Sequence, residues 1–144
     1  MRRYSNAVRW LLVVVWASGI LLASSDLFSA EHSGGLLETL LGRLLTPAVF
    51  DTVHFLLRKA AHLLAYGILG ALGFNAVRGE SRQWRLRWAG YALLIVLAVA
   101  GVDEWHQSHI PSRTGTPIDV GIDLMGAAIA VALSRARHAR IAAP

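Results

Sequence analysis

The residues of this sequence best suited to chemistry are acids, bases and a phenol inside apolar stretches. One group lies in RKAAHLLAYG, where a cation, an imidazole and a phenol follow at intervals of three and four residues: Lys59, His62 and Tyr66. A helix presents these three side chains on one face. Together they supply an ammonium that binds anions, an imidazole that transfers protons, and a hydroxyl that orients a substrate or polarises a leaving oxygen.

Carboxylates form a second group, at the end of one apolar stretch and the start of the next. Asp103 and Gln107 stand four residues apart, with Glu104 beside Asp103. Asp119 and Asp123 also stand four residues apart, so each pair shares a helical face. An Asp near the middle of a membrane costs about 2.5–3.5 kcal/mol, so ionisable residues there are rare and mark functional sites by default. The sequence therefore favours a functional site, with a structural salt-bridge cluster as the alternative.

The composition indicates the environment in which these groups work. The chain has 144 residues, of which 55% are hydrophobic and 16% charged, and its mean hydropathy is +0.48. Soluble domains carry about 25% charged residues, so this chain has too few charges to solvate its surface. A large soluble enzyme, a coiled coil and a disordered tail are excluded. The absence of cysteine excludes disulfides, thiolate nucleophiles and thiolate metal ligands.

Four apolar stretches predict an all-α bundle of four transmembrane helices, forming a single domain over residues 1–144. We expect the spans at about residues 7–24, 60–77, 86–102 and 117–134. Paired leucines alternate with polar residues over 36–45, which predicts a short amphipathic helix at the membrane interface after the first span. The first stretch also has the basic start of a signal peptide, but only a loose cleavage site follows, so we expect it to remain as a span.

The basic residues predict how the chain is oriented. Ten Lys and Arg residues fall at the N-terminus, in the second connection and in the basic tail 135–144, whereas four fall in the first and third connections. This asymmetry predicts a protein of the cell membrane with both termini in the cytoplasm. It also accounts for the pI near 10.7 without a nucleic-acid partner. All the polar clusters then reach the outer leaflet, where Arg113 stands in the short third connection.

The stretch RKAAHLLAYGILG, followed by DEWHQSHIPSRTGTPIDVGIDLMGAA, resembles the VanZ-like family of small membrane proteins. The resemblance covers Arg58 to Ala128 and depends on these residues: Lys59, His62, Tyr66, Asp103, Glu104, Gln107, Pro111, Arg113, Asp119, Asp123 and Gly126. Asp123 stands where the family often has Asn, and Ser112 stands where Gly is common. The resemblance implies an integral membrane protein associated with resistance to the glycopeptide antibiotic teicoplanin, without a defined reaction.

Three functions remain open at this point. The first is an enzyme that acts on a lipid-linked or amphiphilic substrate, such as a cell-wall precursor, at the outer leaflet. Its acid–base residues would be Glu104, Asp103, His62 and Asp119. Its substrate-binding residues would be Lys59, Tyr66, Gln107, Arg113 and Asp123. The second is an accessory protein that binds a glycopeptide or an envelope lipid without chemistry. The third, a transporter or proton relay, is disfavoured because the polar clusters lie on one side of the midplane.

No metal site is predicted, and no cofactor is identified. Carboxylates and an imidazole can bind a hard or borderline divalent cation, and four residues qualify: His62, Asp103, Glu104 and Asp119. The sequence has no H-E-x-x-H helix or other strong ligand motif.

Two geometric expectations follow from the helical faces and the topology. Arg113 should lie within ion-pair reach of at least one acid, because an unpaired acid at that depth is costly. His62 should contact one polar residue of the third or fourth span, since a polar ring facing lipid would lack a partner: Asp103, Glu104, Gln107, Asp119 or Asp123.

Overall fold

The computed structural model describes residues 5–24, 45–81, 83–109 and 116–142. Within these residues there are four helices, α1 (Asn6–Ala23), α3 (Pro47–Arg78), α4 (Leu86–Gln107) and α5 (Pro117–Ala142), and no strand. All four are long and apolar enough to cross a membrane. The predicted all-α fold with four spans is confirmed, and the chain is a multi-pass membrane protein. The sequence predicts an interfacial helix over 36–45, and residues 36–44 of it lie outside the described residues.

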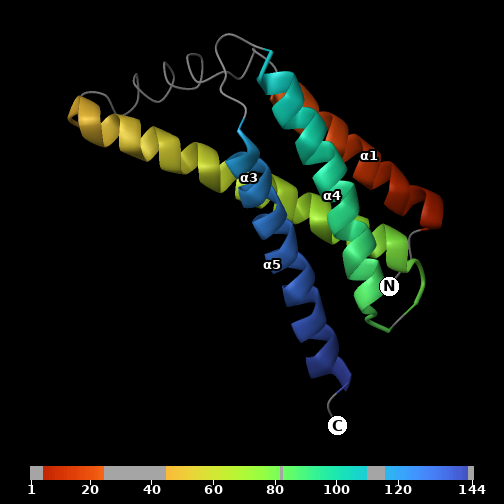
Figure 1. Cartoon of the computed structure of the whole chain (residues 1–144). Coiled ribbons are helices and arrows are strands. Elements are labelled where there is room, and N and C mark those ends of the chain that lie inside the picture. The colour runs from red at the N-terminus through yellow and green to blue at the C-terminus, as the bar shows by residue number, and fades with distance from the viewer. Residues whose placement is uncertain (1–4, 25–44, 82, 110–115, 143–144) are drawn as a thin grey trace.

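The helix α3 is longer than the sequence pattern predicts. It begins at Pro47 instead of residue 60 and continues without a break for 32 residues. Proline is favoured at a helix start because its missing N–H would have no partner there, and neither Gly nor Pro interrupts residues 48–59. The helix ends at Gly79, whose φ of 60° suits glycine. At 1.5 Å per residue α3 is about 48 Å long, more than the hydrocarbon core of a bilayer requires. Its first turns project beyond the other described helices (Figure 1).

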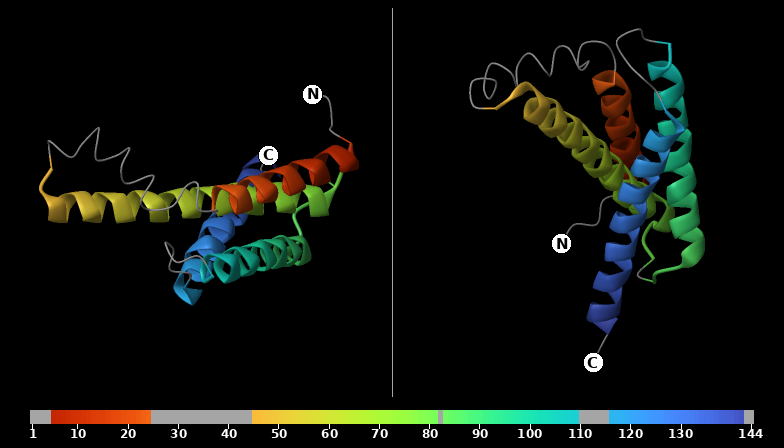
Figure 2. Two further views of the ribbon diagram at one scale, coloured as in Figure 1. Left: turned by 90° about the horizontal axis from the view of Figure 1, so that it is seen from above. Right: turned by 60° about the vertical axis from the view of Figure 1, so that its left-hand side comes forward.

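The helix α3 is also the centre of the bundle. It contacts each of the other three helices, and α4 contacts α5 in addition. Seen from above, α1 and α4 flank α3 on opposite sides (Figure 2). The buried core at this junction consists of side chains from all four helices: Val13, Ile20, Tyr66, Leu69, Val96, Ala100 and Ala127. The side chains that α3 presents to these neighbours are therefore those on which the site is built.

Small residues bring α3 and α5 into close contact. A Cβ atom at Gly126 would lie 2.2 Å from the carbonyl oxygen of Leu63, and one at Gly70 would lie 2.8 Å from the Cβ of Ala127. Such a stripe of small residues lets two helix backbones approach in a membrane, where apolar burial alone does not hold helices together. This contact fixes the height at which α5 meets α3.

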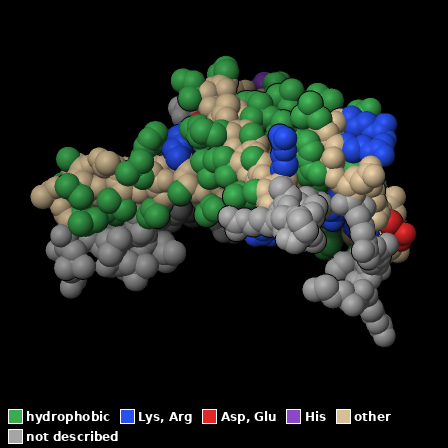
Figure 3. Space-filling model, turned by 90° about the horizontal axis from the view of Figure 1, so that it is seen from below, with side chains coloured by type: hydrophobic (Ala, Val, Ile, Leu, Met, Phe, Trp, Pro, Cys, Tyr) green, Lys and Arg blue, Asp and Glu red, His purple; other side chains and the backbone are tan. Residues whose placement is uncertain are grey.

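The surface agrees with a membrane environment. Hydrophobic side chains are spread over the face seen from below, and the largest group of basic side chains lies at its right-hand edge (Figure 3). Basic residues cluster at the end of the bundle where α3 and α5 finish and α4 begins. Several of them lie over aromatic rings: Arg78 over Phe74, Arg85 and Arg87 over Trp88, and Arg135 over Trp84. The acidic residues of the site lie at the other end of the bundle, where α4 finishes and α5 begins.

Candidate functional site

Two pairs of polar side chains join α3 to the start of α5. Lys59 forms an ion pair with Asp119, and both side chains are partly buried. One turn further along, His62 Nδ1 lies 3.2 Å from Asp123 Oδ1. The carboxyl group of Asp123 is fully buried, whereas 22% of the His62 side chain is exposed. The two helices thus meet through an ammonium–carboxylate pair and, one turn later, an imidazole–carboxylate pair.

Asp103 connects α4 to both α3 and α1. Its Oδ2 atom accepts a hydrogen bond of 2.8 Å from the Tyr66 hydroxyl and one of 3.0 Å from the Ser24 hydroxyl. All three residues are buried. Two hydrogen bonds to one carboxylate oxygen fix its orientation, so Asp103 is well suited to holding helices in place and to orienting Tyr66.

Glu104 is held differently and has an unused oxygen. Its Oε2 atom accepts a hydrogen bond of 2.7 Å from the backbone N–H of Thr116, just before α5. Its Oε1 atom is buried, and no described residue donates a hydrogen bond to it. The same holds, within the described residues, for Asp103 Oδ1 and Asp123 Oδ2, and the Nε2 atom of Gln107 has no acceptor there. Buried polar atoms without partners are uncommon in proteins and call for an explanation.

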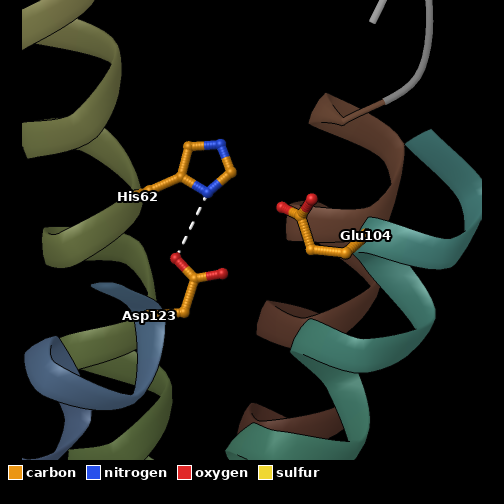
Figure 4. A group of neighbouring side chains, drawn as sticks. All are labelled: His62, Glu104 and Asp123. Carbon is orange, nitrogen blue, oxygen red and sulfur yellow. Dashed lines mark hydrogen bonds and ion pairs between the residues drawn. The ribbon is translucent and has the colours of Figure 1, made fainter. Parts of the chain in front are cut away.

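Three of these side chains point toward one another. His62 from α3, Glu104 from α4 and Asp123 from α5 surround a common space (Figure 4). One nitrogen or oxygen atom from each lies within 4.8 Å of the others. The site therefore brings an imidazole and two carboxylates together from three different helices.

An apolar groove between α1 and α3 leads to this site. Its volume is about 630 Å³, and most of its lining is apolar: Val15, Trp16, Gly19, Ile20, Ala23, Ala61 and Ala65. Its polar lining comes from Ser24, Arg58, His62 and Tyr66. The Trp16 indole N–H donates a hydrogen bond of 2.9 Å to the carbonyl oxygen of Ala65, which holds α1 against α3. Because His62 belongs to both features, the groove and the polar cluster are adjacent.

The geometry meets one sequence expectation and leaves another open. His62 contacts an acid of the last span, namely Asp123, as the shared helical face predicted. Arg113 lies outside the described residues, so its ion pair stays a prediction. Gln107 is buried with only 3% of its surface exposed. The catalytic and substrate-binding roles assigned from the sequence also stay predictions, because geometry alone does not test them.

Sequence reasoning missed three participants of the site. Ser24, which bonds Asp103, stands at the end of α1, where serine is common for reasons of capping alone. Thr116 acts through its backbone N–H, which no side-chain pattern reveals. Arg58 lines the groove, and its adjacency to Lys59 was the only available signal.

The grouping of possible cation ligands also differs from the sequence-based set. Asp119 is engaged with Lys59, and Asp103 is engaged with Ser24 and Tyr66. Asp123 takes their place beside the other two residues of the set: His62 and Glu104.

A family model described as VanZ/LLP1 matches residues 9–138, which is nearly the whole chain. No curated protein and no solved structure matches the chain significantly.

Proposed function

The chain belongs to the VanZ/LLP1 family, and from this premise we propose that it binds an amphiphilic lipid of the cell envelope. The hydrocarbon chain of the ligand lies in the groove between α1 and α3, and its polar group faces the cluster around His62. The protein resides in the cell membrane, and the site opens at the outer leaflet. The observation that carries this proposal is that one side chain, His62, lines the apolar groove and also belongs to the acidic cluster.

The groove has the size and character of a lipid-binding site. Its volume of about 630 Å³ falls within the range of roughly 300–1,000 Å³ that is usual for small-molecule pockets. Val15 is 59% exposed and Trp16 is 38% exposed, so the wall formed by α1 faces the hydrocarbon of the bilayer. A lipid tail can therefore enter sideways without crossing a polar layer.

The polar end of the groove favours an anionic head group. Arg58 lines the groove at this end, and an arginine guanidinium can bind a phosphate through two parallel hydrogen bonds. The family name is linked with teicoplanin resistance, so we propose a lipid-linked cell-wall precursor as the ligand class. A role of this member in glycopeptide resistance is part of the same proposal.

Glu104 is the best candidate for a general base if the ligand is also a substrate. Its Oε1 atom has no hydrogen-bond donor among the described residues, whereas Asp103 already accepts two hydrogen bonds on one oxygen. His62 lies beside Glu104 and is suited to assist proton transfer. Asp119 is paired with Lys59, which favours a positioning role for both residues.

The alternative is an accessory protein whose charged cluster is a structural salt-bridge network. The Lys59–Asp119 pair and the two hydrogen bonds to Asp103 favour it, because they tie α1, α3, α4 and α5 together. The buried carboxylate oxygens that lack partners among the described residues favour a functional site instead, since a clamp gains nothing from them.

We also propose that both termini lie in the cytoplasm. The basic residues at one end of the bundle support this orientation, since cytoplasmic segments near membrane spans are enriched in Lys and Arg. Arg9, at the start of α1, lies close to Gly79, at the end of α3, so α1 contributes a cation to the same basic end.

Lipid retention by purified variants tests the binding proposal. Gly19 lines the groove and has open space where a side chain would extend, so Gly19→Leu should fill the groove without disturbing the helix. Gly101→Leu is the matched control, because Gly101 also has open space but lies outside the groove lining, on α4. We expect native mass spectrometry to show several-fold less bound lipid for Gly19→Leu and wild-type levels for the control. Equal lipid retention by both variants would contradict the proposal.

A further inference from the structure

We propose that His62, Glu104 and Asp123 bind one divalent transition-metal cation of the Zn²⁺ or Mn²⁺ class. The three side chains come from three helices and face a common space (Figure 4). Their ligand atoms lie within 4.8 Å of one another. Two atoms bound to one tetrahedral ion lie about 3.4 Å apart when each bond is about 2.1 Å long. The 3.2 Å between His62 Nδ1 and Asp123 Oδ1 already matches that separation, and a rotation of the Glu104 side chain closes the rest.

Partnerless carboxylate oxygens are the second observation that points to a ligand. Asp123 is fully buried, and Glu104 is 6% exposed. Asp123 Oδ2 and Glu104 Oε1 accept no hydrogen bond from any residue that the structure describes. Burying such an atom without a partner is costly, and most native proteins avoid it. A cation bound by both oxygens of Asp123 and by Glu104 Oε1 would give both of these atoms a partner.

The charge balance of the site favours a cation with two positive charges. Asp103, Glu104 and Asp123 are three buried carboxylates, and His62 is a basic group that lies beside Glu104 and Asp123. Lys59 is already engaged with Asp119. Arg58 lines the groove, and Arg113 lies outside the described residues, so an arginine side chain is the competing source of positive charge. The experiment below distinguishes an arginine from a metal ion.

The ligand set selects the class of metal. One imidazole nitrogen and two carboxylate oxygens suit Zn²⁺ and Mn²⁺. Ca²⁺ prefers six to eight oxygen ligands, more than this site offers, and Mg²⁺ keeps most of its waters. Three protein ligands leave an open coordination position, which is typical of functional rather than structural zinc sites.

The open position adjoins the groove, because His62 is the ligand that lines it. An anionic lipid head group is then the expected fourth ligand. This last step rests on the proposed lipid function, whereas the cation site itself does not.

Metal binding by the full-length protein tests the site without any lipid. The protein, purified in detergent and stripped with a chelator, is titrated separately with Zn²⁺, Mn²⁺ and Ca²⁺, and bound metal is counted by elemental analysis. We expect one Zn²⁺ or Mn²⁺ per chain, a rise in Tm on binding, and much weaker binding of Ca²⁺. Glu104→Gln and Asp123→Asn each remove a ligand with little change in shape. They should weaken binding by at least about 100-fold, since even loss of an outer partner of a metal ligand costs 10–100-fold.

Two control variants separate ligation from general loss of charge. Glu80→Gln removes an exposed acid at the opposite end of the bundle and should leave metal affinity unchanged. Asp119→Asn removes a nearby carboxylate that is not a ligand and should change affinity by a few-fold at most. Failure of every metal to bind at one ion per chain would overturn the proposal, as would wild-type affinity in both ligand variants. Failure of every metal to bind would assign the balancing positive charge to an arginine side chain.

X-ray absorption of the wild-type protein with bound Zn²⁺ keeps the proposal testable even if the ligand variants misfold. We expect one imidazole and otherwise oxygen ligands. Two or more imidazoles would place the ion elsewhere and refute the site. Lipid retention by Gly19→Leu is a separate measurement, so loss of the lipid proposal and loss of the cation proposal remain distinguishable.

Discussion

The closest contact between α3 and α5 allows a sharp prediction for Gly126→Ala. The added Cβ would lie 2.2 Å from the carbonyl oxygen of Leu63, 3.0 Å from its carbonyl carbon and 3.1 Å from its Cα. A carbon and an oxygen in contact are normally at least about 3.3 Å apart. All three obstructing atoms belong to the backbone, so no side chain can rotate away. The two helices must therefore separate by about 1 Å.

The energetic cost follows from this overpacking. Inserting a methyl group into a tightly packed site costs about 1–3 kcal/mol. Alanine is a better helix former than glycine by about 1 kcal/mol, which offsets part of this cost. We expect a net loss of up to about 2 kcal/mol in the free energy of unfolding.

The same substitution should disturb the site. Asp123 lies one turn before Gly126 on α5, and its contact with His62 is 3.2 Å long. A separation of about 1 Å would lengthen this contact beyond hydrogen-bonding distance. Gly126→Ala should thus lose affinity for the metal as well as stability.

The matched control for this prediction is Gly121→Ala on the same helix. No atom lies within 4 Å of a Cβ at Gly121, so the control should be neutral or slightly stabilising. Reversible unfolding in mixed micelles of mild detergent and SDS measures both variants. Equal stability of Gly126→Ala and Gly121→Ala would refute the close packing on which the site depends.

Three further predictions concern single groups of the site and the topology. Tyr66→Phe should lower the free energy of unfolding by about 1.5–3 kcal/mol, because it removes a buried hydrogen bond to the Asp103 carboxylate. Its control is Tyr91→Phe, at a residue that is 55% exposed, which should change the free energy of unfolding by less than about 0.5 kcal/mol in the same assay. If the protein is an enzyme with Glu104 as its general base, Glu104→Gln should abolish turnover of a lipid-linked substrate while lipid retention, measured on metal-free protein, stays at the wild-type level. A pure binder would show binding and phenotype changing together. A reporter fused to the C-terminus should be active only in its cytoplasmic form, and activity on the outside would overturn the placement of the site at the outer leaflet.

Sequence spacing carried enough information to predict that the polar clusters meet. Lys59 and His62 are three residues apart on one helix, and Asp119 and Asp123 are four apart on another. Because one span, α4, lies between them, α3 and α5 cross the membrane in the same direction. A rise of 1.5 Å per residue then places the two pairs at similar heights. The pairing of Lys59 with Asp119 and of His62 with Asp123 follows from this register.

Other features depend on tertiary contacts that spacing does not encode. The first span is apolar on nearly all sides, so its sequence does not indicate which face meets α3 and forms the groove. The early start of α3 was missed because residues 47–59 mix polar and apolar positions, which also suits a separate interfacial helix. The role of Asp103 depends on Ser24, which is 79 residues away along the chain.

Photo-crosslinking with a phospholipid that carries a photoreactive group in its acyl chain tests the central claim most directly. The labelled protein is reconstituted in vesicles, irradiated, digested and mapped by mass spectrometry. We predict that labelling concentrates on residues 15–24 of α1 and 58–66 of α3, the two segments that line the groove, and that Gly19→Leu reduces it. Labelling spread evenly over the exposed apolar surfaces of all four described helices, and unchanged in Gly19→Leu, would contradict a lipid site beside His62.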